Sequence, residues 1–275
     1  MSKIAFLGTG LLGSAFAQAA AQRGDDVTAW NRSANKVLAL KAFGVNAAAT
    51  PADAVRGATR IHLVLKDDGV VETVLAAARS GLSADAIVID HTTTLPALTA
   101  QRAARLAAEG IRYLHCPVFM GPAAARSAKG TMMAAGPRVL FELVQADLQK
   151  MTGKLNYIGE RLDLAAANKL LGNAMIIGVA ALMADVLTLA QASDVPGTDA
   201  IALLGLLDLN AMVAGRGMNM AKGDFAASFE LAMARKDLAL MLQTTGTRPM
   251  AALIAAGHGA ADCSVMGLDT AQTSV

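Results

Sequence analysis

Three glycines near the start of the chain have the spacing of a phosphate-binding turn: Gly8, Gly10 and Gly13. They follow an apolar run at residues 3–7, and an amphipathic stretch at residues 11–23 comes next. The first glycine permits a tight turn, the second lets backbone approach a pyrophosphate, and the third lets the helix pack on the strand. The first N–H groups of that helix, at Leu11 and Leu12, then face the anion. The pattern favours a dinucleotide site over a plain glycine turn.

The end of the next expected strand, residues 27–30, indicates which dinucleotide binds. NAD sites carry an acidic residue there for the ribose 2′-hydroxyl, whereas this chain has Asn31, Arg32 and Ser33. A guanidinium pairs with a 2′-phosphate, and Asn and Ser can donate further hydrogen bonds. We therefore predict NADP(H) as the cofactor. The alternative is that Arg32 is a solvated loop arginine and that the pocket accepts either cofactor.

Lys169 and Asn173 form a second candidate group for chemistry. They lie four residues apart, and therefore on one face of an expected helix, among apolar or small neighbours. Burial of an ammonium is costly and lowers its pKa. Such a lysine can give or take a proton at a carbonyl or hydroxyl oxygen, with Asn173 bonded to the same oxygen. The alternative is a surface lysine whose stem lies along apolar residues.

Strand and helix patterns alternate from residue 3 to about residue 157, which indicates a mostly parallel sheet covered on both faces. Further strands are expected at residues 61–65, 86–90, 113–116, 131–135 and 154–158, and helices at 34–43, 69–79, 96–109 and 138–151. Past Gly159 the pattern changes, and residues 163–193 indicate one helix of roughly 30 residues. We predict an α/β Rossmann dinucleotide-binding domain at residues 1–160, followed by an all-α domain at 161–275 built on that long helix.

Ligands of open parallel sheets bind outside the carboxyl ends of the strands. Three segments follow expected strands there: Leu65-Lys66-Asp67, residues 90–96 and residues 116–122. The threonines at 92–94 either cap the next helix or offer hydroxyls to a nicotinamide ribose or a substrate carboxylate. His91 and His115 have no nucleophile or metal-ligand spacing beside them, so we interpret both as structural and predict no metal site.

Composition and charge narrow the class of protein. The chain has 275 residues, 54% of them apolar and 17% charged, which excludes a disordered chain. The formal net charge is +2 without a basic stripe, so no nucleic-acid partner is expected. Two distant cysteines, Cys116 and Cys263, and an expected strand directly after Met1 and Ser2 favour a cytoplasmic protein without a signal peptide.

The second half of the chain is rich in apolar residues. Its most apolar stretch, at about residues 174–184, is short for a bilayer span, so we expect a buried helix and no membrane partner. An apolar helical surface left exposed promotes association, which favours a homodimer or homotetramer.

Taken together, these segments resemble the β-hydroxyacid dehydrogenase family, which includes 3-hydroxyisobutyrate dehydrogenase and the glyoxylate and succinic semialdehyde reductases. The motifs occur in the family's order: GxGxxG at 8–13, a DxSTxxP-like element at 90–96, PVxxG at 117–121, Ala-Lys-Gly-Thr at 128–131, KxxxN at 169–173, Lys236-Asp237-Leu238, and a closing segment at 257–264. The resemblance implies that Lys169 is the general acid/base and that Asn173 is its partner at the substrate. It also implies that Thr93 contacts the nicotinamide side and that Lys236 closes over the cofactor.

The chain departs from the family pattern at several positions. Where the family usually shows Ser-Gly-Gly for a substrate carboxylate, this chain has Phe119, Met120 and Gly121, which argues against the usual short hydroxyacid. Thr92 replaces a serine and keeps the hydroxyl, and Lys66 replaces a common proline beside the nicotinamide ribose. Gly172 stands where 6-phosphogluconate dehydrogenases carry a histidine, and the chain lacks their longer helical domain. We therefore reject 6-phosphogluconate as the substrate.

We predict an NADPH-dependent oxidoreductase that transfers hydride between the nicotinamide and a small aldehyde or keto acid. One alternative is an imine reductase, which Phe119 and Met120 would suit but Lys169 argues against, because those enzymes commonly carry another residue there. A second alternative is a non-catalytic NADP(H)-binding sensor, against which the retained Lys169 and Asn173 argue.

Overall fold

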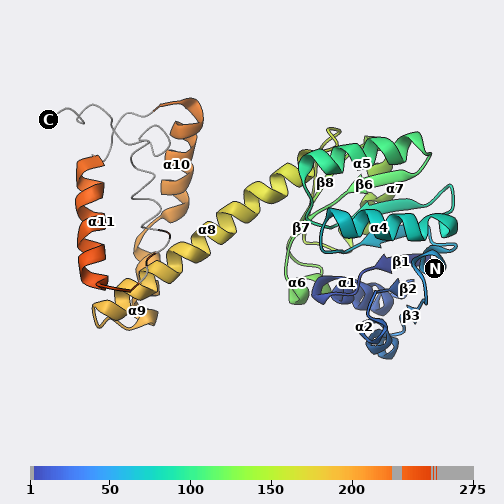
Figure 1. The fold of residues 1–275 in the computed structure, drawn as a ribbon, viewed down its shortest axis with the longest axis horizontal. Coiled ribbons are helices and arrows are strands. Elements are labelled where there is room, and N and C mark those ends of the chain that lie inside the picture. Colours follow the sequence, from blue (N-terminus) through green and yellow to red (C-terminus); the bar gives the residue numbers. More distant parts are fainter. Residues whose placement is uncertain (1–2, 225–230, 249, 251, 253–275) are drawn as a thin grey trace. The chain divides into compact units, whose positions relative to one another are not determined.

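The computed structural model of the protein describes residues 3–224, 231–248, 250 and 252. The chain divides into two compact units, Met1–Gly172 and Asn173–Val275. The first unit holds a nine-stranded sheet with helices on both faces, and the described part of the second unit is helical (Figure 1).

The sheet is parallel over its first six strands in spatial order, β3-β2-β1-β4-β5-β6. The strands are β1 (Lys3–Leu7), β2 (Asp26–Trp30), β3 (Asn46–Ala47), β4 (Arg60–Leu63), β5 (Ile87–Asp90), β6 (Arg112–His115), β7 (Val118–Phe119), β8 (Thr131–Ala135) and β9 (Lys154–Gly159). Strand β8 runs antiparallel to β6 and β7, and β9 pairs with β8 in parallel. The expected mostly parallel sheet is therefore present.

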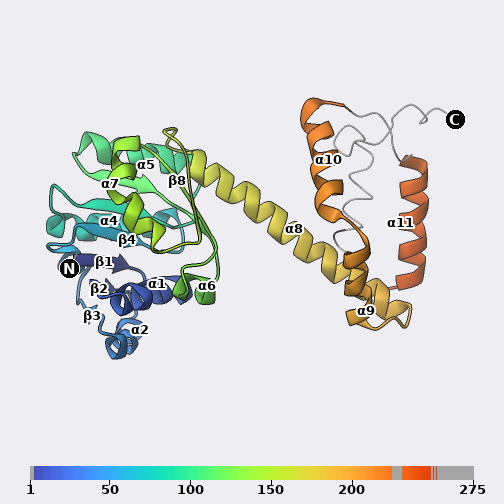
Figure 2. The same ribbon diagram turned by 180° about the vertical axis from the view of Figure 1, so that it is seen from behind.

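Two hydrophobic clusters pack on opposite faces of this sheet, which Figure 2 shows from behind. The helices of the first unit are α1 (Leu11–Gln22), α2 (Ala34–Leu38), α3 (Pro51–Val55), α4 (Asp68–Ala78), α5 (Pro96–Ala108), α6 (Pro122–Arg126) and α7 (Arg138–Gln149). Residues of α1, α6 and α7 belong to one cluster, and residues of α3, α4 and α5 belong to the other. In β5, Ile87 and Ile89 join the first cluster and Val88 joins the second, as the two-residue period of a strand requires.

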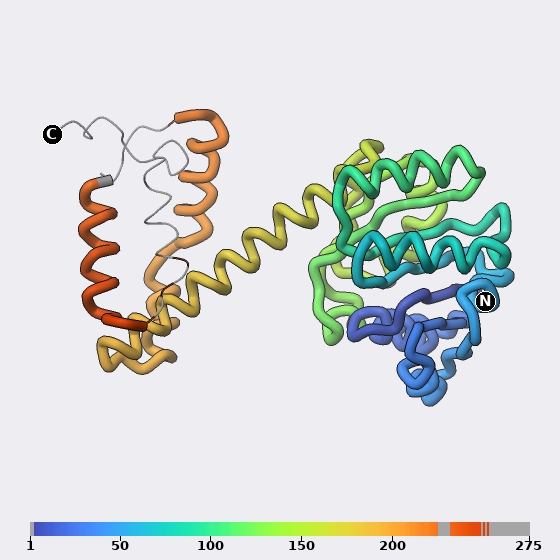
Figure 3. The backbone as a smooth tube through the Cα atoms, viewed as in Figure 1, coloured from blue at the N-terminus to red at the C-terminus, as the bar shows by residue number. Residues whose placement is uncertain are grey.

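Helix α8 (Leu164–Ala192) is the long helix expected after the sheet, and it contains the boundary between the two units. The second unit continues with α9 (Gly197–Ala202), α10 (Leu209–Lys222) and α11 (Leu231–Thr245), whose path Figure 3 traces. A Rossmann domain followed by a helical part with one long helix is thus confirmed.

The apolar stretch of α8 differs from the expectation of a short, buried segment. The helix has 29 residues, and an 18-residue window of it reaches a mean hydropathy of 2.0 with only 6% of that window buried. In the described part of the chain, this helix is long and apolar enough to cross a membrane. The bent pair of helices Gly197–Leu206 and Leu209–Lys222 is also long and apolar enough if the two together form one span. The expected burial is therefore wrong for the single chain, in which Met175, Ile177 and Val179 of this stretch are each more than half exposed.

Candidate active site

The glycine turn between β1 and α1 has the backbone of a phosphate-binding loop. Gly8 has a φ of +100°, and a Cβ there would lie 2.3 Å from the carbonyl oxygen of Val64. A Cβ on Gly13 would lie 2.1 Å from the Gly8 oxygen, so the helix packs on the turn only with glycine there. Gly10 faces open space and begins α1 without a side-chain cap, which leaves helix N–H groups for an anion. The turn therefore fits a pyrophosphate.

A cavity of about 540 Å³ extends from this turn along the end of β2, a size usual for ligand pockets. It is lined by Gly8, Gly10, Trp30, Asn31, Arg32, Ser33, Lys36, Val64, Leu65, Lys66, Val70, Thr73 and Val74. The lining includes the exposed cations Arg32, Lys36 and Lys66 and no carboxylate. Lys36 was not predicted, although its place in α2, four residues after Arg32, is a signal that the sequence contains.

The Asn31 side chain bonds to the backbone on two sides of this pocket. Its Oδ1 accepts a hydrogen bond from the backbone N–H of Thr9 at 3.0 Å, and its Nδ2 donates to the carbonyl of Ser33 at 3.2 Å. The side chain therefore joins the glycine turn to the end of β2. Arg32 is exposed and makes no ion pair with any residue that the structure describes, so its guanidinium is available to a ligand.

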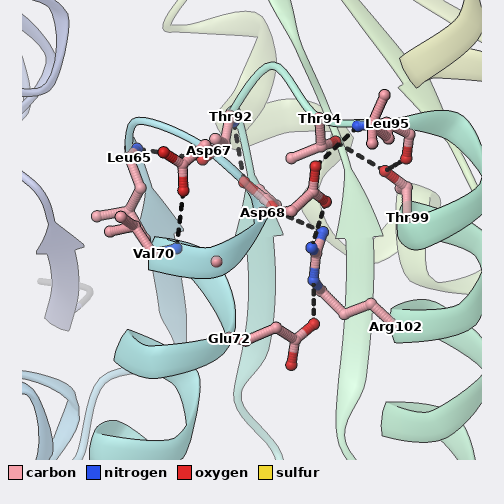
Figure 4. A network of polar contacts seen from close by, with 12 residues as sticks. Leu65, Asp67, Asp68, Val70, Glu72, Thr92, Thr94, Leu95, Thr99 and Arg102 are labelled. Atoms are coloured by element: carbon pink, nitrogen blue, oxygen red, sulfur yellow. Dashed lines mark hydrogen bonds and ion pairs between the residues drawn. The ribbon is translucent and has the colours of Figure 1, made fainter.

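Two loops at the carboxyl end of the sheet, residues 65–67 and 91–95, are joined to each other (Figure 4). The backbone N–H of Leu65 donates to Oγ1 of Thr92 at 3.1 Å, and Asp67 Oδ1 caps α4 by accepting from Val70. Thr92, which is predicted to bind substrate, is only 2% exposed, and its hydroxyl joins the two loops. Thr93 is exposed while Thr92 and Thr94 are buried, so it is the hydroxyl of the three that a ligand can reach.

Lys169 on α8 reaches the segment that follows β6. Its Nζ donates to the backbone carbonyl of Val118 at 2.7 Å and lies 4.0 Å from the centroid of the Phe119 ring. The side chain is half-buried, and burial lowers the pKa of its amine below the ordinary lysine value. The surroundings therefore make this amine give up its proton more readily than an exposed lysine does.

The two large side chains that depart from the family pattern each pack against a glycine. A Cβ added to Gly172 would lie 2.2 Å from Cζ of Phe119, so the ring rests against the helix where it has no side chain. A Cβ added to Gly130, which has a φ of +95°, would lie 2.7 Å from Cβ of Met120. Phe119 thus forms an apolar wall beside the Lys169 amine.

Hydrogen bonds place this segment at the same edge of the sheet as the two loops. The N–H of Cys116 donates to the carbonyl of Asp90 at 2.7 Å, and Nδ1 of His91 lies 2.7 Å from the carbonyl oxygen of Cys116. Val118 and Phe119 follow directly in β7. Lys169, bonded to Val118, therefore belongs to the edge where parallel sheets bind ligands.

The three histidines in the described part of the chain are interior groups. His62 Nδ1 lies 2.9 Å from His91 Nε2, and the two rings stack with Phe6 beside them. Burial lowers the pKa of His91 to about 4 and that of His62 well below its ordinary value, which keeps both rings neutral. Nε2 of His115 lies 3.0 Å from the carbonyl oxygen of Thr92. None of these three rings is exposed, and their contacts support a structural interpretation.

The remaining predicted residues belong to the second unit. Asn173 lies one turn beyond Lys169 on the same helix, and Lys236 lies on α11, where its Nζ is 3.0 Å from Oδ1 of Asp237. The closing segment at 257–264, with Cys263, lies outside the described residues.

Comparison with known proteins shows which family the chain belongs to. Residues 3–159 match the family model of the NAD binding domain of 6-phosphogluconate dehydrogenase. The 3-sulfolactaldehyde reductase of Escherichia coli (strain K12) is 30% identical over 255 residues, covering 88% of this chain and 83% of that protein. The chain belongs to the β-hydroxyacid dehydrogenase family. This membership confirms the family inferred from the motifs.

One further relative and one solved structure are also similar to this chain. The 2-(hydroxymethyl)glutarate dehydrogenase of Eubacterium barkeri is 26% identical over 246 residues, covering 88% of this chain and 81% of that protein. The structure of the Streptomyces aurantiacus imine reductase has a TM-score of 0.84 at 25% identity and covers 96% of each chain. The protein is therefore an NAD(P)-dependent oxidoreductase of the β-hydroxyacid dehydrogenase and imine reductase type.

Proposed function

We propose that this family member is an NADPH-dependent reductase that interconverts a small aldehyde or keto compound with its hydroxy product. The observation that carries the proposal is the half-buried amine of Lys169, held beside Val118 at the sheet edge where the two cofactor-side loops meet. A cation at that position can donate a proton to a carbonyl oxygen as that oxygen gains negative charge.

Each group of residues in the candidate site has its own role in the proposed reaction. A bound nicotinamide supplies or accepts the hydride. The glycine turn and the N-terminus of α1 bind the pyrophosphate, and the loop at 65–67 together with Thr93 orients the nicotinamide half. Lys169 gives its proton to the substrate oxygen during reduction and takes it back during oxidation, while Asn173 hydrogen-bonds the same oxygen. An ammonium has three donors, so one can stay on Val118 while another meets the substrate.

The preference for NADPH rests on charge. Arg32, Lys36 and Lys66 line the cavity beside the turn, and none of the residues lining it is acidic. A 2′-phosphate there would meet positive groups, including a guanidinium that binds phosphate through two parallel hydrogen bonds. The same surroundings offer no carboxylate to the 2′-hydroxyl of NADH.

Phe119 and Met120 define the expected substrate. With Phe119 seated against Gly172 and next to the amine, one side of the substrate position is apolar and offers no donor to a carboxylate. We therefore expect weakly polar aldehydes and ketones to react better than short keto acids. The same wall is the observation that favours the second candidate, reduction of a C=N bond, the activity for which the Streptomyces aurantiacus imine reductase is named.

A second copy of this chain is the partner that the exposed apolar surface of α8 fits. We propose a homodimer or homotetramer in which residues near 174–184 are covered, because an uncovered surface of that kind promotes non-specific association.

The reaction is tested by following NADPH at 340 nm with a panel of aldehydes, ketones, keto acids and cyclic imines. We expect oxidation of NADPH with aldehydes or ketones, and faster reaction with the less polar compounds. Consumption with cyclic imines alone would replace the proposal with the imine reductase. No consumption with any compound, while NADPH still binds, would replace it with the non-catalytic sensor.

A further inference from the structure

Arg102 is a buried charge behind the two loops at the carboxyl end of the sheet. It lies on α5 and its side chain is 1% exposed. Its guanidinium lies 2.5 Å from Asp68 Oδ1 and 2.8 Å from Glu72 Oε1 (Figure 4). A third carboxylate oxygen, Asp90 Oδ2, lies 3.7 Å away. One cation therefore balances acidic groups from both α4 and the end of β5.

Two of these carboxylates hold the backbone of the loops. Asp68 Oδ2 accepts from the N–H of Leu95 at 2.9 Å, and Asp68 begins α4 directly after the loop at 65–67. Asp90 Oδ1 accepts from the N–H of Thr92 at 2.9 Å, and Thr92 Oγ1 accepts from Leu65. The guanidinium thus lies behind a set of bonds that fixes the distance between the two loops.

We infer that Arg102 is a positioning residue for the nicotinamide half of the cofactor. It does not contact the cofactor; it holds Asp68 and Asp90 so that the loop at 65–67 and the exposed Thr93 keep a fixed spacing. Without the guanidinium, Asp68 and Asp90 would keep their hydrogen bonds to Leu95, Thr92 and Tyr113 but lose the buried positive charge beside them, which would destabilise this arrangement of the loops. The inference rests on the proposed placement of the nicotinamide half beside these loops.

The end of β2 provides an internal reference for the adenine half. Trp30, Arg32 and Lys36 line the cavity there and have no contact with Arg102 among the described interactions, whereas Leu65 and Lys66 of the first loop line another part of the same cavity. Removal of Arg102 should therefore weaken binding of the whole cofactor more than binding of a fragment that ends at the adenosine phosphates.

Arg60 is a matched control for the loss of a buried arginine. Its side chain is 10% exposed and pairs with Asp147 at 2.6 Å and Asp25 at 3.9 Å. It lies at the beginning of β4, at the amino end of the sheet and away from the loops. A variant at Arg60 therefore reproduces the loss of a buried ion pair without touching the predicted site.

The experiment compares Arg102→Met, Asp68→Asn and Arg60→Met with the wild type by calorimetric titration of NADP⁺ and of adenosine 2′,5′-bisphosphate, which lacks the nicotinamide. We expect Arg102→Met and Asp68→Asn to raise the Kd of NADP⁺ about tenfold and to leave the Kd of the bisphosphate within about twofold. Arg60→Met should change neither Kd by more than about twofold, although its melting temperature falls. Circular dichroism establishes that each variant is folded.

An equal rise in the Kd of NADP⁺ and of the bisphosphate in Arg102→Met would show that Arg102 acts only on stability and would overturn the inference. A weakened binding of NADP⁺ alone in Arg60→Met would overturn it for the same reason. A folded Arg102→Met or Asp68→Asn variant with wild-type NADP⁺ binding would overturn it as well. If Arg102→Met does not fold, Asp68→Asn decides, because it removes one acceptor and keeps the guanidinium. The readout uses binding alone, so a wild type that reduces no carbonyl compound contradicts the proposed function and leaves this test intact.

Discussion

The two units of the chain bury their apolar residues very differently. Between residues 3 and 172, two clusters of fully buried side chains pack on the faces of the sheet. Among the described residues beyond 172, the buried apolar side chains are Ala190, Ala200 and Met250, whereas large ones such as Ile177 and Val213 are exposed. The first unit thus completes a core from its own residues, whereas large apolar side chains of the second unit are exposed in the single chain.

Most of the buried polar side chains among the described residues also lie in the first unit, although Asp185 and Thr245 are buried in the second. The first unit holds a stacked pair of neutral histidines and a buried arginine with three acidic neighbours, all within its own sheet and helices. Groups of this kind are costly to bury unless they are bonded, so they require a well-packed interior.

Lys169→Ala should give the largest change. Loss of the proton donor should lower kcat about 10³-fold, within the range for general acid catalysis. The Kd of NADP⁺ should stay within about threefold, because the glycine turn and the adenine cavity are untouched. Steady-state kinetics and calorimetry check both values, with Lys154→Ala, an exposed lysine of β9, as the control. Retention of kcat would remove Lys169 from the reaction.

A charge on the apolar surface of α8 should separate the copies. Ile177, which is 67% exposed in the single chain, becomes covered in the proposed dimer, so Ile177→Asp should shift the mass in solution to a smaller species or cause aggregation. Leu38→Asp, at an apolar side chain of the first unit that is 50% exposed, should leave the mass unchanged. Light scattering after gel filtration measures the mass. A wild type that elutes as a monomer would contradict the proposed assembly.

The stability of the first unit should fall in acid because of its neutral histidines. Burial lowers the pKa of His91 to about 4, while an unfolded histidine titrates near 6.5. Between these values the unfolded state binds more protons, so stability is complete above pH 6.5 and is lost as the pH falls toward 4. At pH 5 the loss should be about 2 kcal/mol.

Urea unfolding at pH 7 and pH 5 measures this loss through the fluorescence of Trp30, the single tryptophan of the chain. His91→Asn is the control, because it removes the titrating group from the interior and should reduce the pH dependence. An unchanged free energy of unfolding at the two pH values would contradict the prediction.

Arg32→Ala should weaken binding of NADPH by about 1–3 kcal/mol, the contribution of a charge-assisted contact, and leave NADH nearly unchanged. Lys36→Ala should have a smaller effect of the same kind, because an ammonium does not bind phosphate through two parallel bonds. Calorimetric titration with both cofactors gives the values, and Arg56→Ala, at an arginine whose side chain is 67% exposed and which does not line the cavity, is the control. Equal losses for NADPH and NADH would refute a role at the 2′-phosphate.

Features that depend on local sequence could be predicted. The glycine turn, the parallel sheet and the long helix follow from spacing and from periodicity within a few residues, and each is present. The same reasoning could not give β7, a strand of two residues that exists because it pairs with β8. Nor could it reveal that Asn31 bonds to Thr9, a contact between residues 22 positions apart.

The candidate site shows the same limit. The residue types of Lys169 and Phe119 indicated a role at the substrate. Only the fold shows that the amine lies beside the ring and that the ring packs against Gly172. Arg102 was missed because its partners Asp68 and Glu72 lie 34 and 30 residues away, and nothing in its own helix distinguishes it from an exposed arginine.

The pH dependence of a single turnover tests the role of Lys169 most directly. Enzyme preloaded with NADPH is mixed with an aldehyde that the panel identifies, and the rate of hydride transfer is followed from pH 6 to pH 10. Because the protonated amine is the acid, the account predicts that the wild-type rate falls as the pH rises through the lowered pKa of Lys169, and that Lys169→Met is slow at every pH. A variant with the same profile and rate as the wild type would contradict the account.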